Sequence, residues 1–241
     1  MCDAIPSMRR ALDRLPDGLR ARVRISQDVD EWVADLARQE ARRKHRDDFL
    51  RDVKAGKRST DLVKAKLYPY QVDGMLHLAF NERALLADEM GLGKTVQAIA
   101  ACELLRQTRR IERVLVVAPT SLKTEWEEQI AKFTGLPARL ILGSRAVRLR
   151  QYREPAFFYL TNYEQVVCDL DAVNEFIAPD VVILDEAQRI KNWQTRTART
   201  IKRLSSPYAF VLTGTPLENR IDEGYSIVEF LDPAIFGPLF R

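Results

Sequence analysis

The sequence lacks the features of a secreted, membrane-spanning or zinc-stabilised protein. No apolar run is long enough to cross a bilayer, and the charged N-terminus has no apolar core of a signal peptide. Only three cysteines and two histidines occur in 241 residues, and no C-x-x-C pair is present. These absences argue against a disulfide framework and a zinc site. We therefore expect no membrane partner and a reducing compartment, either a bacterial cytoplasm and nucleoid or a eukaryotic nucleus.

The composition is that of an ordinary globular protein, with 46% hydrophobic and 30% charged residues. A net charge of +4 is compatible with a polyanionic partner without identifying one. Residues 1–60 are read as a helical N-terminal extension, because 28–53 combines dense charge with apolar residues at spacings of three and four. The basic run 42–46 has two readings, a nucleic-acid contact or a solvated helix face with internal ion pairs. Residues 61–241 are expected to form the main domain.

The stretch 83–95, RALLADEMGLGKT, organises the main domain. A short apolar strand, a glycine-rich turn and a helix form the layout of a phosphate-binding loop, in which backbone N–H groups and the helix dipole face an anion. Gly91 and Gly93 permit backbone conformations closed to other residues. Lys94 is expected to reach the β- and γ-phosphates, and the Thr95 hydroxyl to ligate Mg²⁺. A glycine turn that binds nothing is the alternative, because Asp88 stands where the usual template has its first glycine.

Two polar features flank this loop. Upstream, the aromatic ring of Tyr68 can stack on a purine, and the Gln71 amide offers a donor and an acceptor to an adenine edge. Downstream, the strand 180–184 ends in Asp185 and Glu186, the arrangement in which one carboxylate holds Mg²⁺ through water and the next polarises the attacking water. The alternatives are a helix N-terminus packed on the core for the first feature and two exposed loop acids for the second.

Apolar runs predict further strands of a mainly parallel sheet. These runs lie at 113–118, 140–142, 156–160, 180–184 and 208–212. Polar residues that follow them belong on the ligand face of such a sheet, where hydroxyls and free N–H groups can hold a nucleic-acid phosphate. Pro119, Thr120 and Ser121 are such a group, although simple N-capping explains them equally well. Thr161, Asn162 and Tyr163 close a later strand. The small residues Thr213, Gly214 and Thr215 either sense whether a γ-phosphate is present or form an ordinary turn. The arginines of 144–153 form either a duplex-facing patch or an exposed helix.

Five stretches in one order, LYPYQ, DEMGLGKT, the strand with APTSL, DEAQRIKN and LTGTPLEN, closely resemble the Swi/Snf-type ATPases. These are double-stranded-DNA translocases and remodellers of helicase superfamily two. The resemblance covers about residues 66–241, and the family's use of Asp at the first loop position accounts for Asp88. It implies a RecA-like, three-layer α/β/α domain that binds ATP and Mg²⁺, with duplex DNA as its partner.

The resemblance also implies a role for each matching residue. Nucleotide binding falls to Tyr68, Gln71, Asp88, Met90, Gly91, Leu92, Gly93, Lys94 and Thr95. Thr95 and Asp185 resemble the Mg²⁺ ligands, while Lys94, Asp185, Glu186 and Gln188 resemble the catalytic set. Pro119, Thr120, Ser121, Thr161, Asn162 and Tyr163 resemble the track along one DNA strand, and Thr213, Gly214 and Thr215 the element that couples hydrolysis to movement.

Two departures from the family pattern matter. Gln188 stands where the family usually has histidine, although its amide can still hydrogen-bond across to the coupling element. Nothing in the sequence resembles the family's second RecA-like lobe, which supplies arginines to the γ-phosphate. We therefore expect the chain to be the first lobe only, a fragment with weak nucleotide binding and slow hydrolysis. The alternatives are a strand-separating helicase, a restriction-enzyme motor subunit, or an ATP- or DNA-binding module without turnover.

Overall fold

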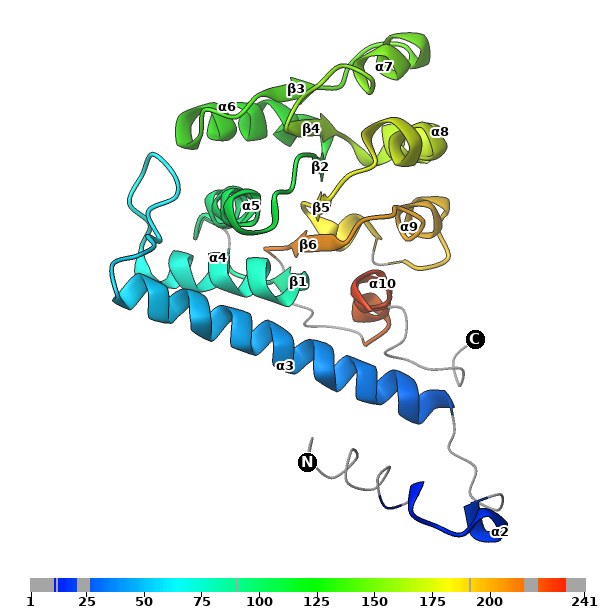
Figure 1. Ribbon diagram of the computed structural model, residues 1–241. Coiled ribbons are helices and arrows are strands. Elements are labelled where there is room, and N and C mark those ends of the chain that lie inside the picture. Colours follow the sequence, from blue (N-terminus) through cyan, green and yellow to red (C-terminus); the bar gives the residue numbers. More distant parts are fainter. Residues whose placement is uncertain are drawn as a thin grey trace. The chain divides into compact units, whose positions relative to one another are not determined.

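The computed structural model describes residues 11, 13–20, 27–89, 91–190, 192–214 and 221–232. The chain forms two compact units that divide between Arg58 and Ser59. The N-terminal unit contains the short helix α2 (Asp17–Arg20) and the long helix α3 (Gln27–Lys54; Figure 1). The helix predicted over 28–53 is therefore present. It ends just before Gly56, whose φ of +69° lies in the left-handed region that favours glycine.

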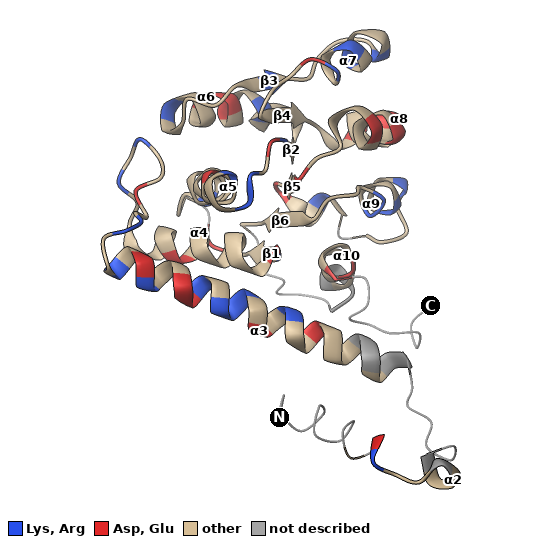
Figure 2. Cartoon of the chain, in the orientation of Figure 1, with Lys and Arg blue, Asp and Glu red and all other residues tan. Residues whose placement is uncertain are grey.

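Charges of both signs are interspersed along α3 (Figure 2). Ion pairs one turn apart join Asp35 to Arg38 and Asp48 to Arg51. Such pairs on an exposed helix contribute only a few tenths of a kcal/mol each, about 0.2–0.5. They lie on either side of the basic run 42–46, whose two readings stay open.

The second unit is built on a six-stranded sheet in which every neighbouring pair is parallel. The strand order is β1-β6-β5-β2-β4-β3. The strands are β1 (Arg83–Leu86), β2 (Val114–Val117), β3 (Ala138–Leu140), β4 (Phe158–Thr161), β5 (Val181–Leu184) and β6 (Tyr208–Leu212).

The burial of each strand follows from its place in the sheet. β2 and β5 are central, and all four residues of each are buried, as their uninterrupted runs of Val, Ile and Leu predict. β3 lies at the edge and is only partly buried. It occupies 138–140 where the apolar run predicted 140–142, so that boundary was wrong. The bounds of β3 are set by its hydrogen bonding to β4, because an edge strand extends only as far as its single neighbouring strand pairs with it.

Helices cover both faces of the sheet (Figure 1). One layer holds α4 (Pro69–Asn81), α5 (Lys94–Arg109) and α6 (Lys123–Phe133), and the other holds α8 (Tyr163–Ala172), α9 (Arg196–Ile201) and α10 (Ile221–Leu231). α7 (Arg145–Gln151) precedes β4, and the π-helix η2 (Val173–Ile177) continues α8. The predicted three-layer α/β/α architecture with a parallel sheet is confirmed. Across the described residues, no helix has the length and apolar character needed to cross a membrane.

The parallel sheet determines where the polar motifs meet. Because the strands all run in one direction, the residues that follow them lie along a single edge of the sheet. The phosphate-loop stretch follows β1, the acidic pair follows β5, and the short 3₁₀ turn η1 (Thr120–Leu122) follows β2. The predicted functional stretches are therefore brought together at the carboxyl edge.

Candidate nucleotide site at the carboxyl edge of the sheet

The phosphate-loop stretch adopts the conformation that its glycines permit. Gly91 has a φ of +86° and Gly93, directly before α5, a φ of +76°. Only glycine adopts such angles without strain. A Cβ atom on Gly93 would also lie 2.7 Å from the Nε2 atom of Gln71, so a larger residue there would displace the Gln71 amide as well. Met90, assigned to this loop from the sequence, lies outside the described residues.

Lys94 folds back over its own loop. Its Nζ atom donates hydrogen bonds to the backbone carbonyls of Asp88 and Glu89, both at 2.9 Å. These contacts tie the ammonium group to the first residues of the loop, and Lys94 lines the same pocket as Thr95 and Val96 of the first turn of α5. The loop therefore presents a positive charge and a helix N-terminus at one point, which is the arrangement that binds anions.

Two glutamine side chains hold the loop through hydrogen bonds. Gln71 Nε2 and Gln97 Nε2 both donate to the Leu92 carbonyl, at 3.3 and 3.2 Å, and Gln97 also donates to the Asp88 carboxylate at 3.2 Å. Gln71 Oε1 accepts from the backbone N–H of Tyr68 at 3.0 Å, which caps α4. Asp88 and Leu92 thus take part in contacts that shape the loop. Sequence reasoning missed Gln97, because only the fold reveals what its buried amide contacts.

The predicted adenine residues divide into a buried and an exposed group. Gln71 is 8% exposed and lines the pocket described below. Tyr68 is 64% exposed and stacks on Tyr70, with ring centroids 5.9 Å apart and planes inclined by 5°. The two rings therefore stack on each other while both remain exposed, and Tyr68 does not line the pocket.

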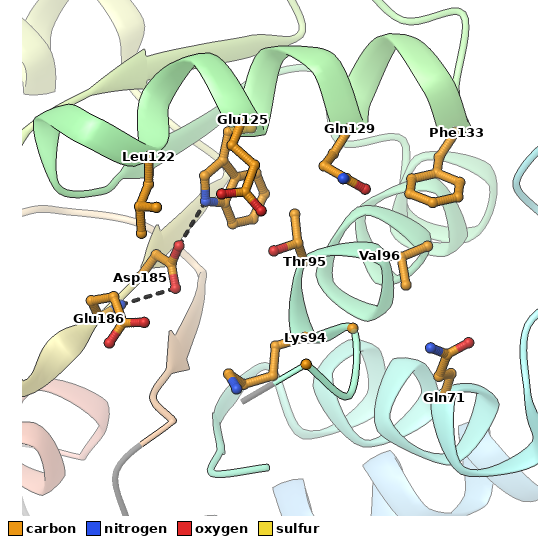
Figure 3. A pocket seen from close by; sticks show the side chains of 13 residues that line it. Gln71, Lys94, Thr95, Val96, Leu122, Glu125, Gln129, Phe133, Asp185 and Glu186 are labelled. Carbon is orange, nitrogen blue, oxygen red and sulfur yellow. Dashed lines mark hydrogen bonds between the residues drawn. The ribbon is translucent and has the colours of Figure 1, made fainter. Parts of the chain in front are cut away.

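The acidic pair follows β5 as predicted. Asp185 is almost fully buried, and each of its carboxylate oxygens accepts one hydrogen bond, Oδ2 from the Trp126 indole at 2.8 Å and Oδ1 from the Glu186 N–H at 2.9 Å (Figure 3). Burial raises the pKa of Asp185, while these two donors act in the opposite direction. The Tyr163 hydroxyl donates to the Asp185 backbone carbonyl at 2.7 Å. Glu186 is held at a φ of +49°, an uncommon conformation for a residue with a side chain.

Gln188 joins the acidic pair to the end of β6. It belongs to the 3₁₀ turn η3 (Ala187–Ile190), and its Nε2 atom donates to the Glu186 carboxylate. Its Oε1 atom accepts from the Thr213 hydroxyl at 3.4 Å. The hydrogen bond expected between Gln188 and the predicted coupling element is therefore present. Gly214 is partly buried beside it, and Thr215 lies outside the described residues.

A cavity of about 440 Å³ lies between the phosphate loop, the acidic pair and helix α6. Gln71, the loop and the acidic pair line it on one side, and α6 lines it on the other. Glu125, Gln129 and Phe133 project from α6 toward Thr95 and Val96 (Figure 3). The structure thus brings Lys94, Thr95, Asp185 and Glu186 to one pocket. The contribution of α6 was not predicted, although the spacing of four between its three residues is a signal for one helix face.

The pocket suits a cation that is coordinated mainly by water and by the phosphates of a nucleotide. Among the described residues no group of three or more His, Cys, Asp or Glu side chains is placed to hold a metal. Mg²⁺ usually takes one or two protein ligands and completes its shell with water and phosphate oxygens. Each oxygen of Asp185 keeps a lone pair beyond its single hydrogen bond, and Thr95 lines the same pocket. The residues present therefore fit a Mg²⁺–nucleotide complex.

The predicted DNA-track residues also come together. Asn162 donates from Nδ2 to the Thr120 hydroxyl at 2.8 Å, so the segments after β2 and β4 touch. Asn162 also caps α8 by accepting from the Gln165 N–H at 2.8 Å. Neither η1 nor α6 has a side-chain cap, and Thr120 and Ser121 are exposed. Capping therefore does not account for these two hydroxyls.

The remaining members of the predicted track are buried. Pro119 and Tyr163 are buried, and Thr161 is fully buried with its hydroxyl donating to Gln165 Oε1 at 3.0 Å. The arginines of the segment 144–153 also make contacts within the protein. Arg145 and Arg148 reach the buried Asp169, and the Arg153 guanidinium lies 3.7 Å from the centre of the Phe176 ring. Intramolecular contacts thus hold three of the four arginines read from the sequence as a patch.

Comparison with known sequences decides the family. The sequence model of the SNF2-related domain matches residues 31–240. The chain belongs to the SNF2-related family.

Two of the relatives resemble the chain over part of their length. It is 34% identical over 202 residues to the ISWI chromatin-remodeling complex ATPase ISW2 of Saccharomyces cerevisiae, covering 79% of this chain and 18% of that protein. It is 35% identical over 185 residues to the putative ATP-dependent helicase/translocase YwqA of Bacillus subtilis, covering 73% and 20%. It therefore spans about a fifth of the length of each.

A solved SNF2-related structure has the same fold. The Sulfolobus solfataricus SWI2/SNF2 ATPase core in complex with dsDNA superimposes with a TM-score of 0.66 at 34% identity. The match covers 73% of this chain and 38% of the Sulfolobus chain. The RecA-like fold class expected from the sequence is thereby confirmed.

Proposed function

We propose that the chain is the ATP-binding motor lobe of a Swi/Snf-type, DNA-dependent ATPase. In this function ATP and Mg²⁺ drive translocation on double-stranded DNA and the remodelling or displacement of bound protein. One observation carries the proposal: the Lys94 ammonium group and the carboxylates of Asp185 and Glu186 line a single cavity. Separate strands deliver these groups, and a phosphate loop facing an acidic pair is the arrangement of nucleotide-hydrolysing enzymes.

Nucleotide binding falls to the loop and its support. The N–H groups at the start of α5 face the phosphates, and Lys94 exchanges the carbonyls of Asp88 and Glu89 for β- and γ-phosphate oxygens. Gln71 keeps one amide hydrogen and one lone pair beyond its present bonds, which an adenine edge can use. The exposed face of Tyr68 then stacks on the purine.

Hydrolysis falls to the acidic pair. Thr95 and Asp185 hold Mg²⁺, which when bound neutralises charge on the phosphates. Glu186 orients the attacking water and accepts its proton, while Gln188 holds the Glu186 carboxylate in place. Because Gln188 also contacts Thr213, a change at the catalytic acid is transmitted to the first residue of the proposed coupling element. This contact is the proposed start of the coupling between hydrolysis and movement.

Slow turnover is part of the proposal. Among the described residues Lys94 is the only cation that lines the pocket. Related phosphate-loop enzymes gain roughly 10³–10⁵ in rate from an arginine supplied from outside the site. We assign that arginine to a second RecA-like lobe, which makes that lobe a partner of this chain. Alone, the chain binds nucleotide weakly and hydrolyses it slowly.

Duplex DNA is the proposed polymer partner. The exposed hydroxyls of Thr120 and Ser121 contact the phosphates of one strand, and Asn162 holds Thr120 in place. Pro119, Thr161 and Tyr163 act through these neighbours, since they are buried. The dsDNA in the related Sulfolobus complex supports this partner. Contacts to the backbone carry no sequence information, so binding is sequence-independent.

Calorimetric titration with a non-hydrolysable ATP analogue and Mg²⁺ tests the nucleotide site. Lys94→Ala is expected to weaken binding roughly 10- to 100-fold, the effect of losing one charge-assisted contact. Lys57→Ala, an exposed lysine of the N-terminal unit, is the matched control and should bind as the wild type does. Equal affinities in Lys94→Ala and the wild type would refute the proposed site. Strand displacement by the protein in the presence of ATP would instead favour a strand-separating helicase.

A further inference from the structure

Trp126 makes a contact that the proposed function leaves unexplained. This residue of α6 is 1% exposed and is one of the largest buried side chains. Its indole has a single polar atom, the Nε1–H donor, and that donor is directed to Oδ2 of Asp185 at 2.8 Å. Figure 3 draws this bond as a dashed line to Asp185. The indole ring lines the same pocket as Lys94 and Thr95.

The Asp185 carboxylate is fixed in one orientation by its surroundings. The neighbouring Glu186 N–H holds Oδ1, and the Tyr163 hydroxyl holds the backbone carbonyl. Trp126 provides the contact to Oδ2, and it reaches Asp185 from a different element, α6. Without this donor, the carboxylate can rotate about its last bond, and the lone pairs available to a cation change direction.

We infer that Trp126 is a positioning residue, whose indole N–H orients the Asp185 carboxylate for the cation that accompanies the nucleotide. The inference rests on the proposed function, because it takes Asp185 as the cation ligand. A hydrogen bond to a metal ligand from outside the coordination shell typically contributes 10- to 100-fold in metal affinity or activity. A tryptophan that only fills the core has no such effect on the metal.

Calorimetry with a non-hydrolysable ATP analogue distinguishes a Trp126 that positions Asp185 from a Trp126 that only fills the core. The affinity is measured with Mg²⁺ and with EDTA, and the ratio is the gain that Mg²⁺ provides. Trp126→Phe keeps a ring and removes the N–H, so we expect the gain to fall about tenfold while the affinity in EDTA stays the same. Trp193→Phe makes the same chemical change at an exposed site and should leave both values unchanged.

A double-mutant cycle with Asp185→Asn then identifies the path of the effect. If Trp126 acts through Asp185, Trp126→Phe adds nothing in the Asp185→Asn background. Three results overturn the inference. The first is that the effects of Trp126→Phe and Asp185→Asn add. The others are that Trp126→Phe weakens analogue binding equally with Mg²⁺ and with EDTA, or that it keeps the gain from Mg²⁺ seen in the wild type. In these cases the proposed function stands, provided Asp185→Asn alone removes the gain. If the wild type shows no Mg²⁺ gain, the proposed function itself fails.

Fluorescence gives a second measurement that keeps Trp126 intact. The chain has three tryptophans, so Trp32→Phe with Trp193→Phe leaves Trp126 as the single emitter. We expect the analogue with Mg²⁺ to change its emission, and the analogue with EDTA to change it less. Asp185→Asn should remove the difference. Emission that is insensitive to Mg²⁺, in a protein whose analogue binding requires Mg²⁺, contradicts the inference even if Trp126→Phe does not fold.

Discussion

Gln188 connects two stretches of sequence through one side chain. Its Nε2 atom donates to the proposed catalytic acid Glu186, and its Oε1 atom accepts from Thr213 at the end of β6. The family pattern that the sequence resembles has histidine at this position, and a histidine ring likewise presents two polar atoms. The role thus requires one donor toward Glu186 and a second polar atom toward Thr213, which glutamine supplies.

Removal of this side chain tests that role. Gln188→Ala loses a hydrogen bond to a carboxylate, and we expect single-turnover ATP hydrolysis to slow roughly tenfold while analogue affinity changes little. Gln188→His keeps a donor and should retain most of the rate.

Gln194→Ala is the matched control, because Gln194 is exposed. If Gln188→Ala hydrolyses ATP as fast as Gln194→Ala, then Gln188 does not hold the catalytic acid.

At the scale of elements, the contact between α4 and α5 shapes the phosphate loop. Gln97 of α5 is fully buried, and its Oε1 atom lies so close to Gly74 of α4 that an added Cβ would be 1.7 Å away. The amide group of Gln97 meanwhile holds the Leu92 carbonyl and the Asp88 carboxylate. The close approach of the helices is therefore linked to the loop shape.

Gly74→Ala should disturb both the fold and the loop. Alanine favours a helix over glycine by about 1 kcal/mol, but overpacking a core costs ~1–3 kcal/mol. We expect a net destabilisation of about 1 kcal/mol in urea unfolding and weaker analogue binding, because Gln97 must move off Leu92.

Gly135→Ala is the control, since an added Cβ there meets nothing within 4 Å. Gln97→Ala in the Gly74→Ala background should relieve the clash, so that the two changes are not additive. A stability of Gly74→Ala equal to that of the wild type would show that the helices part without cost.

The secondary-structure elements differ in how well the sequence predicts them. The central strands were placed well, because continuous runs such as Val114–Val117 suit a strand buried on both faces. β3 was misplaced by two residues, because an edge strand is defined by its partner and not by its own apolarity. Helix α6 was expected from its position and from Trp126 and Ile130, both buried.

The loop, the acidic pair and Gln71 were predicted as pocket residues, since their chemistry is encoded in short motifs. The contacts of Gln97 and Trp126 were not, because they join positions far apart in the chain. A buried indole N–H needs an acceptor, and this was the available signal for Trp126. The sequence does not specify which acceptor the fold provides.

On the scale of the whole molecule, the parallel sheet places the proposed nucleotide pocket and DNA track side by side. The track begins after β2 and β4, while the pocket is formed after β1 and β5, and β5 neighbours β2 in the sheet. Tyr163, directly after Asn162, contacts the Asp185 carbonyl. A residue of the predicted track therefore contacts the backbone of the acidic pair directly.

The final prediction concerns how this track binds DNA. If Thr120 and Ser121 hold phosphates through neutral hydroxyls, changing both to alanine removes contacts without removing a cation. We expect duplex affinity to fall about tenfold, equally for unrelated sequences. The slope of log affinity against log salt should stay the same, because that slope counts the phosphates neutralised by Lys and Arg. Fluorescence anisotropy with labelled duplexes at several salt concentrations measures both quantities.

Thr108→Ala is the control, since this threonine lies in the last turn of α5, away from the track, and its hydroxyl bonds within the helix. A loss confined to one duplex sequence would indicate base readout, which neutral contacts to a backbone cannot produce. A flatter salt slope would mean that cations positioned by this turn make the contacts. Unchanged affinity would place the DNA on another face of the lobe. The exposure of the two hydroxyls, which cap no helix, favours the uniform loss.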